Sequence, residues 1–208
     1  MNALSIQPSS RLGQALAMLM TADAPVIPWS DEVAQARRGD RSAFEAIVRG
    51  LQRPVYGLCL RLLANEAEAA EVAQESFLRA WSHLDRFDGR RPFEVWLMAI
   101  ARNLCLDLLR RRGRHPTQDV EPLQEVLSSP EASQEEQAIS KQTYRSLEEA
   151  MAQLGLQDRE VLALYYVQRR TTREIADIMG VAPGTIMARL FRAREKLRRM
   201  MAQEEVAT

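Results

Sequence analysis

Apolar residues recur at intervals of three and four positions along most of this chain, the spacing that gathers them on one face of an α-helix. Between Ser30 and Arg114 the pattern predicts four main amphipathic helices. Their expected inward positions are Phe44, Ile47, Val48 and Leu51 in the first; Val55, Leu58, Cys59 and Leu62 in the second; Ala70, Ala73, Phe77, Trp81 and Leu84 in the third; and Phe93, Trp96, Leu97, Ile100 and Leu104 in the fourth.

Residues that satisfy free backbone groups indicate where these helices begin. Asp40 suits the N-cap of the first helix, and Asn65 with Glu68 three residues later has the pattern of a capping box that opens the third. Proline is tolerated in the first turn of a helix because its missing N–H would have no partner there. We therefore expect Pro54 and Pro92 to begin the second and fourth helices.

Helical spacing returns from Tyr144 to Met201, beginning with a stripe of Leu147, Met151 and Leu154. The stretch between the two helical parts is acidic and is interrupted by Pro116, Pro122 and Pro130, which is typical of a linker. No segment alternates as a β-strand would. The sequence thus predicts an all-α protein with two helical domains, 30–114 and 143–203, a flexible linker at 115–142, and a mobile extension at 1–29.

The second domain contains the pattern of a helix-turn-helix. Thr171 and Glu174 form a second capping-box pattern, Gly180 stands where that short helix ends, and Pro183 fits the first turn of a longer helix. A short helix, a glycine-containing turn and a longer helix are typical of this DNA-binding motif. The outer face of the longer helix carries a basic row that can contact phosphates: Arg189, Arg192, Lys196 and Arg199.

Net charge does not reveal a nucleic-acid partner, because 28 Lys and Arg balance 28 Asp and Glu, but the distribution of charge does. The end of the fourth helix is rich in arginine, and aromatic residues precede it, a combination that suits unstacked DNA. The third helix instead shows an acidic strip with an apolar centre, which suits a basic partner helix. That strip consists of Glu71, Gln74, Glu75 and Leu78.

Other functional classes find little support in the residues. Cys59 and Cys105 stand alone in apolar stretches, so buried thiols are expected rather than a zinc site. His83 and His115 belong to no catalytic group, and there is no glycine-rich phosphate loop, so we expect no enzyme, metal or cofactor. No run is long enough to span a membrane, and Leu12, Leu16 and Leu19 suggest only a weak amphipathic helix. A cytoplasmic location is favoured.

Several motifs, in this order, resemble a known family. Residues 38–44 (RGDRSAF), 71–77 (EVAQESF), 93–97 (FEVWL) and 100–103 (IARN) look like region 2 of the extracytoplasmic-function (group IV) sigma factors of the sigma-70 family. Residues 159–162 (REVL), 174–176 (EIA), 184–186 (GTI) and 191–197 (FRAREKL) look like their region 4. The resemblance implies a transcription initiation factor that binds core RNA polymerase and promoter DNA, and whose activity an anti-sigma factor controls.

The resemblance also implies roles for individual residues. The polymerase-docking set is Glu71, Gln74, Glu75 and Leu78. The set that melts and reads the minus-ten promoter element is Trp96, Arg102, Asn103, Arg110 and Arg111. The set that reads the minus-thirty-five element is Gly184, Thr185, Ala188, Arg189, Phe191, Arg192 and Lys196.

Two positions depart from the family pattern. Glu71 replaces the usual aspartate, which is a conservative change. Met187 and Ala188 replace a basic residue followed by serine, which removes hydrogen-bond donors from the reading face. We hypothesise that the minus-thirty-five preference of this chain is altered, with apolar contact to thymine methyl groups.

A stand-alone helix-turn-helix regulator with a helical sensor domain is the alternative. It explains residues 144–201, but it does not explain the arginine-rich helix end and the acidic strip of the first half. A regulator of that kind binds duplex DNA by itself. The balanced charge of this chain predicts negligible promoter binding without polymerase, because phosphate contacts dominate non-specific affinity.

Overall fold

The computed structural model describes residues 29–113 and 149–207, together with Gly13, Leu16, Gln142, Ser146 and Leu147, and side chains as far as residue 202. Every regular element in this part of the chain is a helix, which confirms the all-α prediction. The elements are α2 (Ser30–Arg37), α3 (Arg41–Leu63), α4 (Glu66–Ser82), η1 (Leu84–Arg86), α5 (Phe93–Arg112), α7 (Leu156–Leu162), η2 (Ala163–Val167), α8 (Thr172–Met179) and α9 (Pro183–Ala207).

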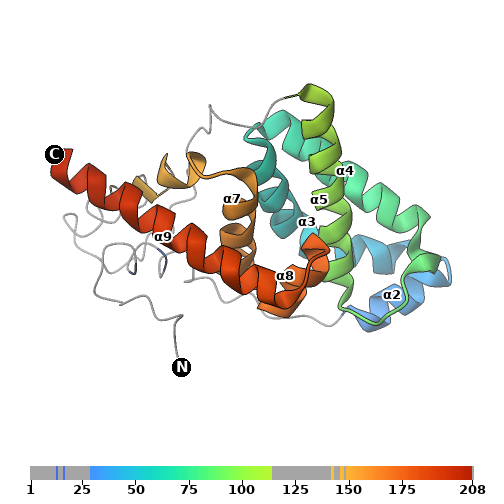
Figure 1. Ribbon diagram of the computed structural model, residues 1–208. Coiled ribbons are helices and arrows are strands. Elements are labelled where there is room, and N and C mark those ends of the chain that lie inside the picture. The colour runs from blue at the N-terminus through green and yellow to red at the C-terminus, as the bar shows by residue number, and fades with distance from the viewer. Residues whose placement is uncertain are drawn as a thin grey trace, which may run out of the picture.

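Helices α3, α4 and α5 pack on one another to form the first domain, with α2 against α3 (Figure 1). Asp40 caps α3 as expected, because its carboxylate accepts the backbone N–H groups of Ser42 and Ala43. The prediction that a new helix begins at Pro54 is wrong. Pro54 lies inside α3, where Leu51 and Val55 on either side of it are buried, so core packing carries the helix past a residue that disfavours a helix interior.

The start of α4 has half of the expected capping box. The Asn65 side chain accepts the backbone N–H of Glu68 at 3.0 Å, but the Glu68 carboxylate pairs with Arg112 at the end of α5. The inward stripe of α4 also ends earlier than predicted. Trp81 is 36% exposed rather than buried, and Leu84 is buried from the short helix η1 after α4 has ended.

The second domain confirms the predicted helix-turn-helix. Thr171 and Glu174 form a reciprocal capping box at the start of α8, and Gly180 ends that helix with a φ of +67°, a conformation that glycine adopts without a Cβ clash. Pro183 is the first residue of α9. The predicted inward residues of α9 are all buried: Ile186, Leu190, Ala193 and Leu197.

The two domains share one hydrophobic core, in which α5 contacts α8 and α3 contacts α7 and η2. Figure 1 shows the second domain against the side of the first, with the far part of α9 extending away from both. No helix of the described part is long and apolar enough to cross a membrane.

Two sequence predictions fall mostly on residues outside the described ranges. They are the flexible linker at 115–142, of which Gln142 alone is described, and the amphipathic helix of the N-terminal extension. From that extension Leu16 is helical and buried, whereas Leu12 and Leu19 lie outside the described residues. At the start of the first domain, Trp29 packs so closely on α3 that a Cβ at Gly50 would clash with its ring.

Candidate partner and nucleic-acid surfaces

An apolar groove of about 700 Å³ runs between α3 and α4. Phe44 and Trp81, which both line it, are in contact with ring centroids 4.9 Å apart, and Leu78, also in the lining, has 57% of its surface exposed. The residues that line the groove are Phe44, Val48, Gln52, Arg53, Tyr56, Ala70, Ala73, Gln74, Phe77, Leu78 and Trp81. Exposed apolar surface of this kind, with a polar rim, is typical of an interaction site.

The groove separates the four residues of the predicted docking strip into two pairs. Gln74 and Leu78 line it, whereas Glu71 and Glu75 lie on α4 outside its lining. Glu71 is exposed, and Glu75 accepts a hydrogen bond from Arg79 at 2.8 Å. Sequence reasoning missed Trp81 as a groove residue because its spacing matches the inward stripe of α4. The helix pattern alone could not show that the core stops short of it.

Helix α5 carries the predicted minus-ten residues, which differ in their exposure to solvent and in their partners. Trp96 is half-buried in an aromatic cluster, with its ring 5.3 Å from that of Phe87 and 5.5 Å from that of Phe93. Asn103 and Arg111 are exposed, and Arg110 is exposed while paired with Asp107 at 2.6 Å. Arg102, by contrast, is only 13% exposed, because its guanidinium is bound by Glu160 of α7.

Helix α9 presents the predicted minus-thirty-five residues from its first turns. Gly184, Ala188 and Arg192 are exposed, Thr185 is half-buried, and the Phe191 side chain is 54% exposed. Met187 stands one turn before Phe191 and is 47% exposed, so the two form an apolar pair on the open face of the helix.

The two remaining residues of the predicted minus-thirty-five set, Arg189 and Lys196, do not stand free on the outer face of α9 as the sequence suggested. Arg189 is half-buried, and its charge acts on the Glu160 carboxyl. The Lys196 ammonium is paired with the Asp158 carboxylate of α7. Of the four basic residues predicted on the outer face of this helix, Arg192, Lys196 and Arg199 are exposed to solvent and Arg189 is half-buried.

Tyr166 fixes α9 against the preceding helices. The Arg194 Nε donates a hydrogen bond to the Tyr166 hydroxyl at 2.7 Å, and the same guanidinium lies over the rings of Tyr165 and Tyr166 at 5.2 and 5.3 Å. Burial raises the pKa of Tyr166, so this hydroxyl stays neutral and able to accept. The contact joins the middle of α9 to η2.

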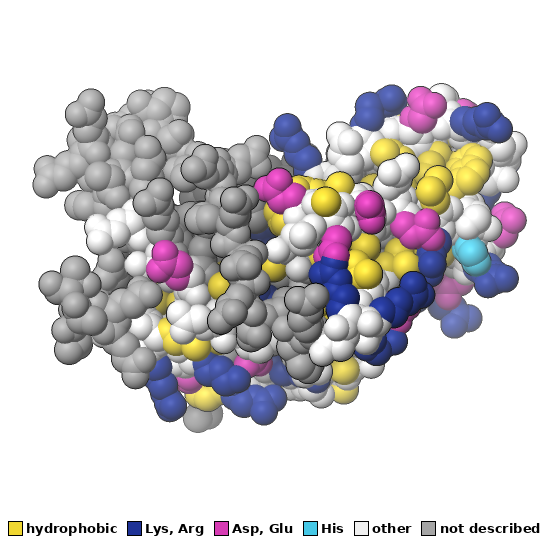
Figure 2. Space-filling view, turned by 90° about the horizontal axis from the view of Figure 1, so that it is seen from above, with side chains coloured by type: hydrophobic (Ala, Val, Ile, Leu, Met, Phe, Trp, Pro, Cys, Tyr) yellow, Lys and Arg dark blue, Asp and Glu magenta, His cyan; other side chains and the backbone are white. Residues whose placement is uncertain are grey.

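Charged and apolar side chains are interspersed on the face drawn in Figure 2. Seen from above, apolar side chains gather in patches between acidic and basic ones, and basic side chains lie both along the edges of this view and within it. Among the described residues no group of three or more His, Cys, Asp or Glu side chains could hold a metal ion. Cys59 and Cys105 are both buried and free.

Comparison with known proteins agrees with both halves of the fold. The sigma-70 region 2 family matches residues 47–115, and the sigma-70 region 4 family matches residues 144–197. The ECF RNA polymerase sigma factor SigW of Bacillus subtilis is 31% identical over 176 residues, which cover 81% of this chain and 94% of SigW. The ECF RNA polymerase sigma-E factor of Salmonella typhimurium is 33% identical over 179 residues, 79% of this chain and 90% of that protein.

Solved structures show the same fold at lower sequence identity. CnrH, in complex with the cytosolic domain of CnrY, matches with a TM-score of 0.60 and 24% identity, over 83% of this chain and 96% of that chain. The sigma factor RpoE of Bartonella quintana, in complex with the anti-sigma factor NepR, matches with a TM-score of 0.61 and 22% identity, over 76% of this chain and 96% of that chain. With both sigma-70 regions present in order and relatives matched over nearly their whole length, the chain belongs to the extracytoplasmic-function sigma factors, which are transcription initiation factors.

Proposed function

We propose that this sigma factor uses three separate surfaces to start transcription. The groove between α3 and α4 docks a helical element of core RNA polymerase. The exposed part of α5 opens and reads the minus-ten element, and the first turns of α9 read the minus-thirty-five element. The observation that carries this proposal is the apolar groove with Gln74 and Leu78 at its edge, because a stand-alone DNA-binding regulator has no need of it.

Each surface has the chemistry that its partner requires. The groove offers apolar area beside the acidic Glu71, which suits a partner helix with apolar and basic residues. On α5, the exposed Asn103 and Arg111 supply hydrogen bonds and charge on the same helix as the half-buried ring of Trp96. On α9, the exposed Arg192 can contact a phosphate while the helix start enters the major groove.

Two further assignments follow from this role. The chain acts in the cytoplasm, where RNA polymerase works, and it contributes no catalytic step of its own. We also assign it an anti-sigma factor as regulatory partner. The RpoE structure of similar fold is bound to such a protein. The exposed Leu78 and Trp81 give this chain apolar surface that a regulator could cover in competition with polymerase.

Run-off transcription with purified core polymerase and genomic promoter fragments tests the proposal. Specific transcripts are expected only when the chain is added, and their upstream sequences will define both promoter elements. The free chain is expected not to retard the same fragments at physiological salt. Absence of transcripts, together with tight duplex binding by the free chain, would favour the regulator and refute the proposal.

A further inference from the structure

Residues 83–92 connect α4 to α5, and their one regular element is the three-residue helix η1. Beyond η1 the chain turns at Gly89, whose φ of +70° suits a residue without a Cβ. The Asp88 carboxylate accepts the backbone N–H of Arg90 at 3.0 Å, which closes the turn. All three residues are exposed, and a Cβ at Gly89 would meet no atom within 4 Å. We call residues 88–92 the α4–α5 turn.

Arg37, the last residue of α2, holds the base of this turn. Its Nε donates to the Leu84 carbonyl at 3.2 Å, and its Nη2 donates to the Phe87 carbonyl. Leu84 is the first residue of η1, and Phe87 follows the last. A guanidinium carries its N–H groups in one rigid plane, so it can bind two carbonyls at a fixed spacing. One side chain thus fixes both ends of η1 from 47 and 50 positions away in the chain.

The same guanidinium is linked through an aromatic ring to Trp96. It lies 5.7 Å from the centroid of the Phe87 ring, within the range of a cation–π contact. The Phe87 ring meets Phe93 edge-on at 5.4 Å and Trp96 at 5.3 Å. Phe87 and Phe93 are buried, whereas Trp96 is half-buried and keeps part of its surface free. Arg37 therefore supports, through Phe87, the ring that we assign to the minus-ten element.

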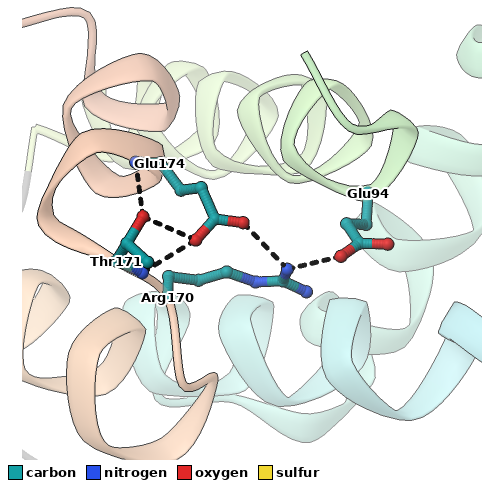
Figure 3. A network of polar contacts seen from close by, with 4 residues as sticks. All are labelled: Glu94, Arg170, Thr171 and Glu174. Carbon is teal, nitrogen blue, oxygen red and sulfur yellow. Dashed lines mark hydrogen bonds and ion pairs between the residues drawn. The ribbon is translucent and has the colours of Figure 1, made fainter. Parts of the chain in front are cut away.

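The first turn of α5 has a second support, which comes from the other domain. Figure 3 shows Arg170 between two carboxylates, that of Glu94 on one side and that of Glu174 on the other. Its Nη1 donates to Glu94 Oε1 at 2.6 Å, and Glu94 is buried. Arg170 lies just before α8, whereas Arg37 and its partners all belong to the first domain. The support from Arg37 therefore does not depend on how the two domains pack.

Arginine suits this task better than a side chain that carries charge alone. A single 3₁₀ turn has poor hydrogen-bond geometry and little stability of its own. Hydrogen bonds from a charged donor are stronger than those between neutral groups, and the flat face of a guanidinium stacks on a ring. A lysine ammonium is a point charge and cannot make the same set of contacts. The order that Arg37 imposes matters for binding, because a preformed surface loses less conformational entropy when a ligand docks.

We propose that Arg37 is a positioning residue for minus-ten recognition. It holds the α4–α5 turn and, through Phe87, the Trp96 ring in the arrangement that an unpaired minus-ten base meets. This inference rests on the proposed function, which assigns α5 to the minus-ten element. It adds a residue of α2 that lies outside the predicted minus-ten set. Arg37 acts through the turn and the ring, and not by binding a DNA phosphate.

The experiment uses the complex of core polymerase with the full chain, and a fluorescein-labelled DNA fork taken from a promoter that run-off transcription defines. The fork is duplex at minus thirty-five and in the spacer, and single-stranded on the nontemplate strand at minus ten. A second fork carries abasic sites at the minus-ten positions. The ratio of the two affinities measures base recognition, because the phosphates and the minus-thirty-five contacts are the same in both forks.

Arg37→Ala is compared with Arg38→Ala, which removes the same charge from the next residue, also exposed. We expect Arg37→Ala to weaken binding to the intact DNA fork roughly tenfold, the lower end of the effect of losing a hydrogen bond to a charged group. Its affinities for the abasic fork and for core polymerase should not change, and Arg38→Ala should behave as the wild type. Arg37→Lys keeps the charge but not the planar donor group, so it should lose nearly as much as Arg37→Ala.

An unchanged ratio of affinities in Arg37→Ala would overturn the proposal, whether or not both affinities fall. Full recovery in Arg37→Lys would also overturn it, because that result indicates a direct charge contact with DNA. If Arg37→Ala loses its helical circular dichroism signal, Phe87→Leu decides, because it removes the ring between Arg37 and Trp96 and keeps both carbonyls. That variant should lose the same discrimination, and a wild-type ratio in it would refute the inference. A wild-type complex that binds both forks equally would instead refute the proposed function.

Discussion

The hydroxyl of Tyr166 accepts a hydrogen bond from the Arg194 Nε at 2.7 Å, and both residues are buried where η2 meets the middle of the last helix. The contact ties α9 to η2 by joining two residues that are 28 positions apart in the chain. It holds α9 against η2 through a buried polar contact. It also gives a prediction about stability.

Replacement Tyr166→Phe should destabilise the second domain by about 1–3 kcal/mol, because a buried guanidinium N–H loses its acceptor and gains none. Urea unfolding followed by circular dichroism measures the loss. Tyr165→Phe is the control, because it leaves intact the ring that lies 5.2 Å from the Arg194 guanidinium and does not alter the Tyr166 hydroxyl. Equal loss in the two variants would show that the hydrogen bond is unimportant.

Truncation of Leu78 should weaken the complex with core polymerase. Its side chain is 57% exposed at the edge of the groove, so Leu78→Ala removes contact area without disturbing the core. We expect roughly tenfold weaker binding, equivalent to about 1.4 kcal/mol. Titration of labelled chain with core polymerase checks this, with Glu45→Ala on α3 outside the groove as the control. Unchanged affinity in Leu78→Ala would move the docking surface elsewhere.

The apolar pair on α9 predicts an altered promoter preference. Met187→Arg should shift the minus-thirty-five sequences recovered from a randomised pool toward guanine, because arginine donates to the guanine edge whereas methionine favours the thymine methyl. The matched control is Ala202→Arg, which adds the same charge at an exposed position farther along the helix. If Met187→Arg and the wild type select the same sequences, the hypothesis of apolar contact with thymine methyl groups is refuted.

The buried carboxyl of Glu160 predicts a pH dependence. Its pKa is raised above the 4.5 of a free glutamate chiefly by burial, so between 4.5 and its folded pKa the folded protein holds a proton that the unfolded chain has released. The Glu160 contribution to the free energy of unfolding therefore falls as pH rises through that window. Urea unfolding from pH 4.5 to 8 should show the wild type losing stability relative to Glu160→Gln. If the wild type instead gains stability relative to Glu160→Gln as pH rises, the raised pKa of Glu160 is contradicted.

The local features of this chain follow from its sequence. Asp40, the Thr171 and Glu174 capping box, and Gly180 occupy the helix ends that they predict. These residues act on backbone groups within four positions, so their effect depends little on distant contacts, although Arg112 of α5 draws Glu68 away from the box at Asn65. The inward stripe of α9 was equally predictable, because helical spacing fixes which side chains share a face. Local sequence signals therefore suffice to predict the helix-turn-helix, including the helix that we propose reads the minus-thirty-five element.

What the tertiary structure alone decided depends on residues far apart in the chain. Burial of Leu51 and Val55 carries α3 through Pro54, against the local preference for a break, and the end of the core leaves Trp81 at the groove. The pairing of Arg102 with Glu160 joins residues 58 positions apart. Helical spacing places each of them on a face of its own helix, but it says nothing about which helix the other domain will bring. A buried charge is stable only beside its partner, and that partner is set by how the two domains pack.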